Sequence, residues 1–232
     1  VLADAAYGIN TEFREGLTEL DLQYVVGVQS SMTVWEPGQQ PLPAKPRRRM
    51  GRPPRLLQRS QDHRPVTVKQ LAIALPASAF KGITWREGTN QKLHSRFAAV
   101  RVRPAHRDNE RAEPRAEEWL LIEWPHGEPE PTKYWVSTLP PTTQFKALIK
   151  MAKHRWIIER DYQELKQELG LGHFEGRNWR GFHHHATLCI AAYGFLVAER
   201  NRFSPSARAG HLAFIAPGPA PDFRPRGSPR SP

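Results

Sequence analysis

The clearest hydrophobic pattern in the chain lies in residues 155–172, which read RWIIERDYQELKQELGLG. Apolar side chains recur there at the spacing of one helix face, at Ile158, Tyr162, Leu165 and Leu169. The stretch contains no proline, and Gly170 and Gly172 stand where a helix would end. We therefore predict one helix over residues 155–172.

Charged side chains form a second stripe on the same predicted helix. Arg155, Glu159 and Lys166 follow one another at helical spacings, and Tyr162 lies between the last two. Side chains at these spacings stack along one side of a helix, so a carboxylate is held between two cations. Taken alone, such residues are most often surface ion pairs that contribute about 0.3–0.5 kcal/mol each.

The first thirty residues alternate between strand and helix patterns. Residues 1–3 are apolar and end at Asp4, residues 11–20 have an amphipathic pattern that Asn10 or Thr11 can cap, and residues 23–29 are rich in β-branched side chains. Strand, helix and strand form a βαβ unit, which predicts an α/β fold. Asp4 then lies at the sheet edge where open sheets carry their sites, although a lone Asp there can also simply cap a turn.

Residues 31–133 differ in composition and predict a basic, β-rich insertion. Residues 36–65 are rich in proline and contain a run of arginines with no acid among them, at Arg47, Arg48, Arg49, Arg52 and Arg55. Such a segment cannot bury a core, so it is either a solvated basic loop or an arm that contacts DNA phosphates. Short strand patterns come next, with a possible helix at 66–75, in residues 82–85, 97–103 and 119–124.

Helical patterns return in the last third of the chain. A strand pattern at residues 134–139 comes first, and Thr142 or Thr143 is placed to cap a helix before the acidic one. After a loop at 175–182, we expect an apolar helix from about residue 186 to residue 199.

Three consecutive histidines precede that helix, at His183, His184 and His185. Metal ligands on a helix are better placed at i and i+4, so adjacent histidines point in different directions. We therefore favour two other roles over a metal site. One is packing at the start of the helix, and the other is contact with DNA phosphates by Arg177, Arg180 and His183.

The charge balance points to a polyanionic partner. The chain has 34 lysines and arginines against 23 acids, which gives a formal charge of +11 over 232 residues. No apolar stretch reaches the ~20 residues of a membrane span, so we expect a cytosolic protein. Cys189 is the only cysteine, which excludes an internal disulfide and predicts a buried core residue. Residues 204–232, rich in proline, glycine and arginine, predict a disordered tail.

The string from residue 155 to residue 166 resembles the third-carboxylate helix of insertion-sequence transposases of the DDE type, in the branch with a β-rich insertion. That branch has an Arg, three residues, a Glu, six residues and a Lys, and Arg155, Glu159 and Lys166 fit it. Its usual Tyr before the Arg is replaced by Ala152 here. The segment LADAAYG around Asp4 resembles the second-carboxylate strand, and residues 170–196 resemble the family's segment just after the acidic helix.

The resemblance implies a ribonuclease-H-like catalytic core formed by residues 1–30 and 134–203. Asp4 and Glu159 would be catalytic and would ligate two Mg²⁺ or Mn²⁺ ions about 3.5–4 Å apart. The family has an earlier Asp that no residue here matches. We therefore expect an amino-terminally truncated fragment that binds DNA but cuts it poorly alone.

The resemblance also implies the partners. DNA, both transposon ends and target, would be held by Arg155, Tyr162 and Lys166 together with the basic residues named above, in a homodimer on paired ends, without a membrane or a small-molecule cofactor, in the cytoplasm at the nucleoid. Some relatives stack a Trp of the insertion on a flipped base. Candidates here are Trp35, Trp85, Trp119 and Trp124, although core packing is the commoner role.

The implied function is metal-dependent DNA strand cleavage and strand transfer in cut-and-paste transposition. Two alternatives remain open. A catalytically dead remnant would bind DNA and do nothing more, and a two-metal nuclease would cut strands without joining them.

Overall fold

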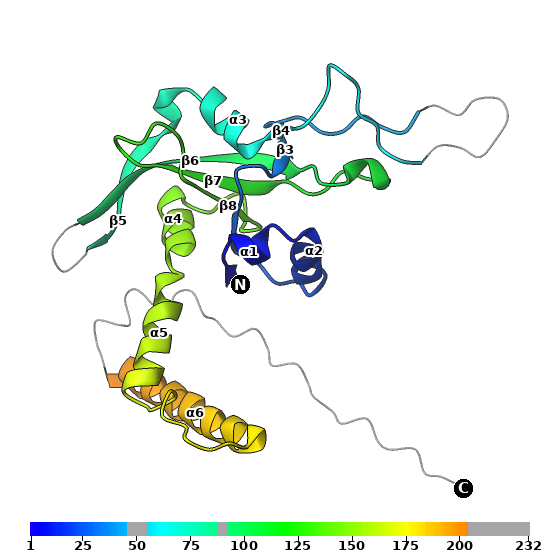
Figure 1. The fold of residues 1–232 in the computed structure, drawn as a ribbon. Helices are drawn as coiled ribbons and strands as arrows, with labels where there is room; N and C mark the ends of the chain where they lie inside the picture. Colours follow the sequence, from blue (N-terminus) through cyan, green and yellow to red (C-terminus); the bar gives the residue numbers. More distant parts are fainter. Residues whose placement is uncertain (46–54, 88–91, 204–232) are drawn as a thin grey trace, which may run out of the picture. The chain divides into compact units, whose positions relative to one another are not determined.

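The computed structural model describes residues 1–45, 55–87 and 92–203 (Figure 1). The chain consists of two compact units, Val1–Ile157 and the part from Ile158 onward. The predicted tail at 204–232 lies outside the described residues, as do four arginines of the predicted arm, Arg47, Arg48, Arg49 and Arg52.

The first unit begins with the predicted βαβ unit. Strand β1 (Leu2–Ala3), helices α1 (Ala5–Gly8) and α2 (Thr11–Glu19), and strand β2 (Val25–Val28) occur in that order. β1 and β2 pair in parallel, which confirms the prediction. The side chain of Asn10 caps α2 by accepting a hydrogen bond from the backbone N–H of Phe13 at 3.2 Å.

One mixed sheet of eight strands runs through the first unit (Figure 1). The strand order is β1-β2-β8-β7-β6-β3-β4. Strand β5 lies off this path and pairs with the first part of β6, from Lys92 to Phe97. Among the described strands, only β1 and β2 are parallel. The remaining strands are β3 (Thr33–Trp35), β4 (Val66–Thr67), β5 (Lys81–Glu87), β6 (Lys92–Pro104), β7 (Glu118–Trp124) and β8 (Lys133–Ser137).

Strands from the predicted insertion therefore extend the sheet that begins with the βαβ unit. β7 is hydrogen-bonded to β8 over its length, with Leu120 opposite Val136. Helix α3 (Val68–Ala74) has a complete capping box, in which Thr67 and Gln70 satisfy each other's backbone N–H groups. Two short 3₁₀ turns, η1 (Ala77–Ala79) and η2 (Asp108–Glu110), complete this part. The division into core and insertion stays a prediction.

The sheet buries side chains on both faces. On one face, side chains of α2 and α3, such as Leu17 and Leu71, pack against Val26 and Leu120 of the strands. On the other face, Leu148 of α4 (Phe145–Lys153) belongs to a second cluster that contains Val25, Phe97 and Leu121. Neighbouring residues of one strand thus face opposite layers, as strand geometry requires.

Helix boundaries in the last third differ from the prediction. α4 begins after Gln144 without a side-chain cap, so the predicted cap at Thr142 or Thr143 is wrong. A turn at His154 and Arg155 separates α4 from α5 (Trp156–Gln167), so the acidic helix is shorter than residues 155–172. The positive φ of Gly170, 70°, keeps the chain from continuing as a helix.

The last helix, α6 (Trp179–Phe203), starts well before residue 186, within the predicted loop. The reason is local, because the side chain of Asn178 accepts the backbone N–H of Arg180 at 2.9 Å and so caps the first turn.

In the second unit, polar groups of α6 bind the end of α5. Cys189 donates its Sγ–H to the carbonyl of Leu169 at 3.1 Å, and Nε2 of His185 lies 2.9 Å from the carbonyl of Gly170. These contacts satisfy two carbonyls of the segment that follows Gln167, the last residue of α5. Cys189 is buried, as predicted. Among the described residues, no helix is long and apolar enough to cross a membrane.

Candidate active site

Asp4 stands at the carboxyl end of β1 and also caps α1. Its Oδ1 accepts the backbone N–H groups of Ala6 at 3.0 Å and Tyr7 at 3.4 Å. The capping role left open by the sequence is therefore real. The side chain nevertheless remains 41 % exposed, and its other oxygen, Oδ2, faces Arg155. One carboxylate oxygen is thus fixed by the backbone while the other is available to a ligand.

Two glycines set the position of this carboxylate. A Cβ atom added at Gly8 would lie 1.9 Å from the carbonyl oxygen of Gly27, and one added at Gly27 would lie 3.0 Å from the backbone nitrogen of Ala5. α1 can therefore approach β2 closely only because both positions lack side chains. The buried Arg14 then holds the end of α1, because its guanidinium donates to the carbonyl of Gly8.

Arg155 reaches Asp4 from the other end of the first unit. Its Nη1 lies 3.5 Å from Oδ2 of Asp4, although the two residues are 151 positions apart in the sequence. Both side chains are partly exposed, Arg155 by 39 %. This contact brings the residue that precedes the acidic helix to the candidate catalytic Asp.

A buried ion pair fixes the chain just before Arg155. The ammonium of Lys153 lies 2.6 and 2.5 Å from the two carboxylate oxygens of Glu123 on β7. The same ammonium lies over the rings of Trp85 and Trp135. Burial lowers the pKa of the Lys153 ammonium, while the carboxylate of Glu123 opposes that shift. Sequence reasoning missed this pair, which ties the end of α4 to the sheet.

The four candidate tryptophans of the predicted insertion all contact neighbours in the first unit. Trp35 is buried and donates its Nε1–H to Asp108 at 2.6 Å. A cation lies over the ring of each of the others, and these pairs are Lys153 with Trp85, Arg101 with Trp119, and Arg96 with Trp124. Packing accounts for these contacts.

The charged stripe lies on one side of α5. Glu159 is in the first turn, Tyr162 is 56 % exposed, and Nζ of Lys166 lies 5.7 Å from the centre of the Tyr162 ring. α6 contacts the opposite side of α5, where the hydroxyl of Tyr193 donates to Asp161 at 2.7 Å. The helix therefore presents the stripe away from α6.

The basic residues near the start of α6 are exposed. Arg177, Arg180 and His183 lie at or just before its first turns, and the ring of His183 meets that of Trp179 edge to face at 4.3 Å. His185 is instead bound to the carbonyl of Gly170. Within the described ranges, no group of three or more His, Cys, Asp or Glu side chains is placed to hold a metal ion.

The structure thus brings together some of the predicted site residues. Asp4 and Arg155 are in contact, and Glu159, Tyr162 and Lys166 share one side of α5. Asp4 belongs to the first unit and Glu159 to the second, so their shared metal site stays a prediction. The donor chemistry suits Mg²⁺, because carboxylate oxygens are the hard ligands it prefers and Oδ2 of Asp4 accepts no backbone hydrogen bond in the described structure.

The fold and the position of Asp4 at the end of β1 indicate a class of protein. A mixed sheet flanked by helices, with an Asp at the carboxyl end of a parallel strand, is consistent with a ribonuclease-H-like α/β fold. Residues 1–92 match the family model described as DDE superfamily endonuclease, and this match supports the predicted resemblance to a DDE transposase-like fragment. The matched residues include Asp4 and end before Glu159. No curated protein matches the chain.

The family match supports a nuclease-type activity in general terms. A DDE endonuclease is a nuclease-type enzyme whose substrate is DNA, and such domains generally use divalent metal ions.

Proposed function

We propose that this chain is the catalytic part of a transposase that cleaves DNA strands and joins them to a target in cut-and-paste transposition. The contact between Asp4 and Arg155 carries the proposal. It joins the segment that resembles the second-carboxylate strand to the residue that precedes the acidic helix. In the proposal, Glu159 completes the site with Asp4.

Asp4 and Glu159 would hold the divalent metal. When bound, a pair of such ions supplies a nucleophilic oxygen at neutral pH and neutralises the departing 3′ oxygen. The protein's contribution at Asp4 is orientation, because the N–H groups of Ala6 and Tyr7 hold Oδ1 and leave Oδ2 facing Arg155. A carboxylate that is fixed in advance loses little freedom when it binds a ligand.

Basic side chains would hold the DNA backbone around this site. Arg155 has a planar guanidinium that suits phosphate oxygens and is already in place beside Asp4. Lys166 and Tyr162 would extend the contact along α5. The remaining members of the proposed surface are Arg177, Arg180, His183 and, from the arm, Arg47, Arg48, Arg49 and Arg52.

The first test is metal affinity of the 232-residue chain, measured with Mn²⁺ by titration calorimetry. Asp4→Asn and Glu159→Gln should each weaken binding at least about tenfold, since each removes one charged ligand. Asp21→Asn and Glu168→Gln are matched controls at other exposed acids and should leave binding unchanged. Equal loss in the controls would mean that Mn²⁺ binds the general negative charge of the surface.

The second test separates transposition from simple cleavage. The reading frame that contains these residues should cut a DNA duplex with transposon ends in Mg²⁺ and join the 3′ ends to a target plasmid. Glu159→Gln should lose both steps and keep DNA binding. The 232-residue chain alone should bind DNA but cut it poorly. Cutting without joining would favour a two-metal nuclease, which the endonuclease description of the family also admits.

A further inference from the structure

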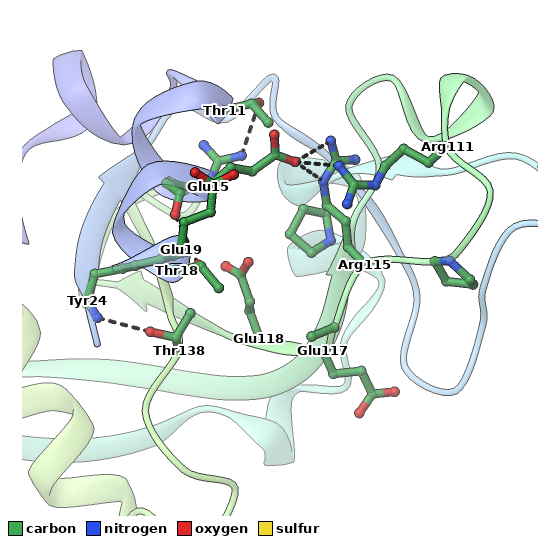
Figure 2. Close-up of a pocket in the computed structure, with 14 residues that line it drawn as sticks. Thr11, Glu15, Thr18, Glu19, Tyr24, Arg111, Arg115, Glu117, Glu118 and Thr138 are labelled. Carbon is green, nitrogen blue, oxygen red and sulfur yellow. Dashed lines mark hydrogen bonds and ion pairs between the residues drawn. The ribbon is translucent and has the colours of Figure 1, made fainter. Parts of the chain in front are cut away.

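A pocket of about 510 Å³ lies in the first unit, on the side of α2 that faces the start of β7 (Figure 2). Its volume falls within the range of small-molecule sites in proteins. α2 supplies one wall, and the segment at 111–118 supplies the facing wall. Four glutamates and three arginines line it, so the lining carries excess negative charge.

The arginines of this pocket are already engaged. Arg111 and Arg115 both donate to the same oxygen of Glu15, at 2.8 and 2.9 Å. Arg14 donates to the carbonyl of Gly8 and, at 3.3 Å, to the hydroxyl of Thr11. Their donors are therefore directed at protein acceptors, and an anionic ligand would have to displace these contacts.

One oxygen of Glu118 is not engaged in this way. The residue is only 8 % exposed, and its Oε2 is buried without a hydrogen-bond partner among the residues that the structure describes. Figure 2 shows its carboxyl pointing into the space bordered by Thr18, Glu15 and Arg115. A buried carboxylate oxygen without a donor is costly, so a ligand that brings donors would be stabilised there.

We propose that this pocket binds a small organic cation of the alkylguanidinium class, with Glu118 as its ion-pair partner. A guanidinium carries only donors and pairs with a carboxylate through two parallel hydrogen bonds. Pro104 and Pro114 in the lining offer apolar contact to the alkyl part, and Glu19 adds negative charge. A bare metal ion fits less well, since the described residues contain no group of three or more metal-ligating side chains. The site does not depend on Asp4, Glu159 or the proposed reaction.

The test uses two probes of nearly the same shape, butylguanidinium and the neutral butylurea, with the full 232-residue chain. Calorimetry should show that butylguanidinium binds and that butylurea binds at least about tenfold more weakly. Glu118→Gln, which keeps the shape and removes the charge, should weaken butylguanidinium at least about tenfold. Glu113→Gln is the matched control, because Glu113 is exposed in the same segment and does not line the pocket.

A second measurement on the unaltered chain keeps the proposal testable if Glu118→Gln does not fold. Amide resonances of Thr18, Glu19 and Thr138 should shift when butylguanidinium is added and should not shift with butylurea. Equal affinity for both probes, equal loss in the Glu113 variant, or shifts confined to other parts of the chain would each overturn the proposal.

Discussion

Two ion pairs at the end of α4 use the same chemistry in opposite surroundings. The pair of Lys153 with Glu123 is closed, with side chains 11 % and 6 % exposed and both carboxylate oxygens bound. The pair of Arg155 with Asp4 is open, with side chains 39 % and 41 % exposed and a longer contact of 3.5 Å. The closed pair is therefore shut off from solvent, whereas both side chains of the open pair are accessible to it.

The position of the open pair depends on the closed pair. The closed pair ties the last residue of α4 to β7, so the chain enters the next turn at a fixed point. Arg155 comes two positions later and is thereby brought to Asp4. We infer that the closed pair is structural and positions the open one.

The largest effect should come from breaking the closed pair. Glu123→Gln leaves the Lys153 ammonium buried without its counter-charge and should lower the free energy of unfolding by about 3–5 kcal/mol. Urea unfolding measures this. Glu128→Gln, at an exposed acid beyond the end of β7, should change it by less than about 0.5 kcal/mol. A loss below about 1 kcal/mol in Glu123→Gln would show that the pair does not hold α4 in place.

Glu118 is a buried carboxylate with less complete pairing, so replacing it should raise the free energy of unfolding where replacing Glu123 lowers it. Burial raises the pKa of the Glu118 carboxyl above its ordinary value of 4.5, although Tyr24 and nearby arginines oppose the shift. The folded state then keeps its proton to higher pH than the unfolded state, so the contribution of Glu118 to stability falls as pH rises above about 4.5.

Glu118→Gln removes this pH dependence. The variant should match the unaltered chain below about pH 4 and exceed its free energy of unfolding by about 1–3 kcal/mol at alkaline pH. Urea unfolding across this pH range measures the difference between the two. A difference that does not change with pH would contradict the raised pKa.

The smallest effect on stability should come from the open pair. Asp4→Asn keeps an N-cap for α1, because Asn caps helices as well as Asp does, and removes only an exposed ion pair. Its free energy of unfolding should therefore change by less than about 1 kcal/mol by urea unfolding. A loss as large as that of Glu123→Gln would mean that Asp4 is mainly structural.

Features set by neighbouring residues could be predicted from the sequence. The parallel β1–α2–β2 unit arises from local alternation and from Asn10, whose cap needs only residues close by in the chain. The strand at 119–124 arises from its run of apolar and aromatic residues and is extended only by Glu118. The start of α6 was missed because Asn178, its cap, lies among glycines and arginines that are typical of a loop.

Features that need distant partners could not be predicted from pattern alone. The closed pair joins β7 to α4, and nothing near Lys153 in the sequence indicates Glu123. Glu118 was missed for the same reason, since its burial depends on α2 and on Tyr24. The link between Asp4 and Glu159 came from resemblance to a family, because nothing near Asp4 in the sequence indicates Glu159.

The central claim is that the carboxylates of Asp4 and Glu159 share one metal site, and a cross-link tests it most directly. Two carboxylates that share a pair of ions lie within about 8 Å of each other. The chain with Cys189→Ser, Asp4→Cys and Glu159→Cys should form an intramolecular link with a bis-maleimide of that span, each maleimide adding one cysteine thiol, as read by mass spectrometry. The same chain with Glu168→Cys in place of Glu159→Cys should not. Absence of the link between positions 4 and 159, or equal linking in the control, would contradict the shared site.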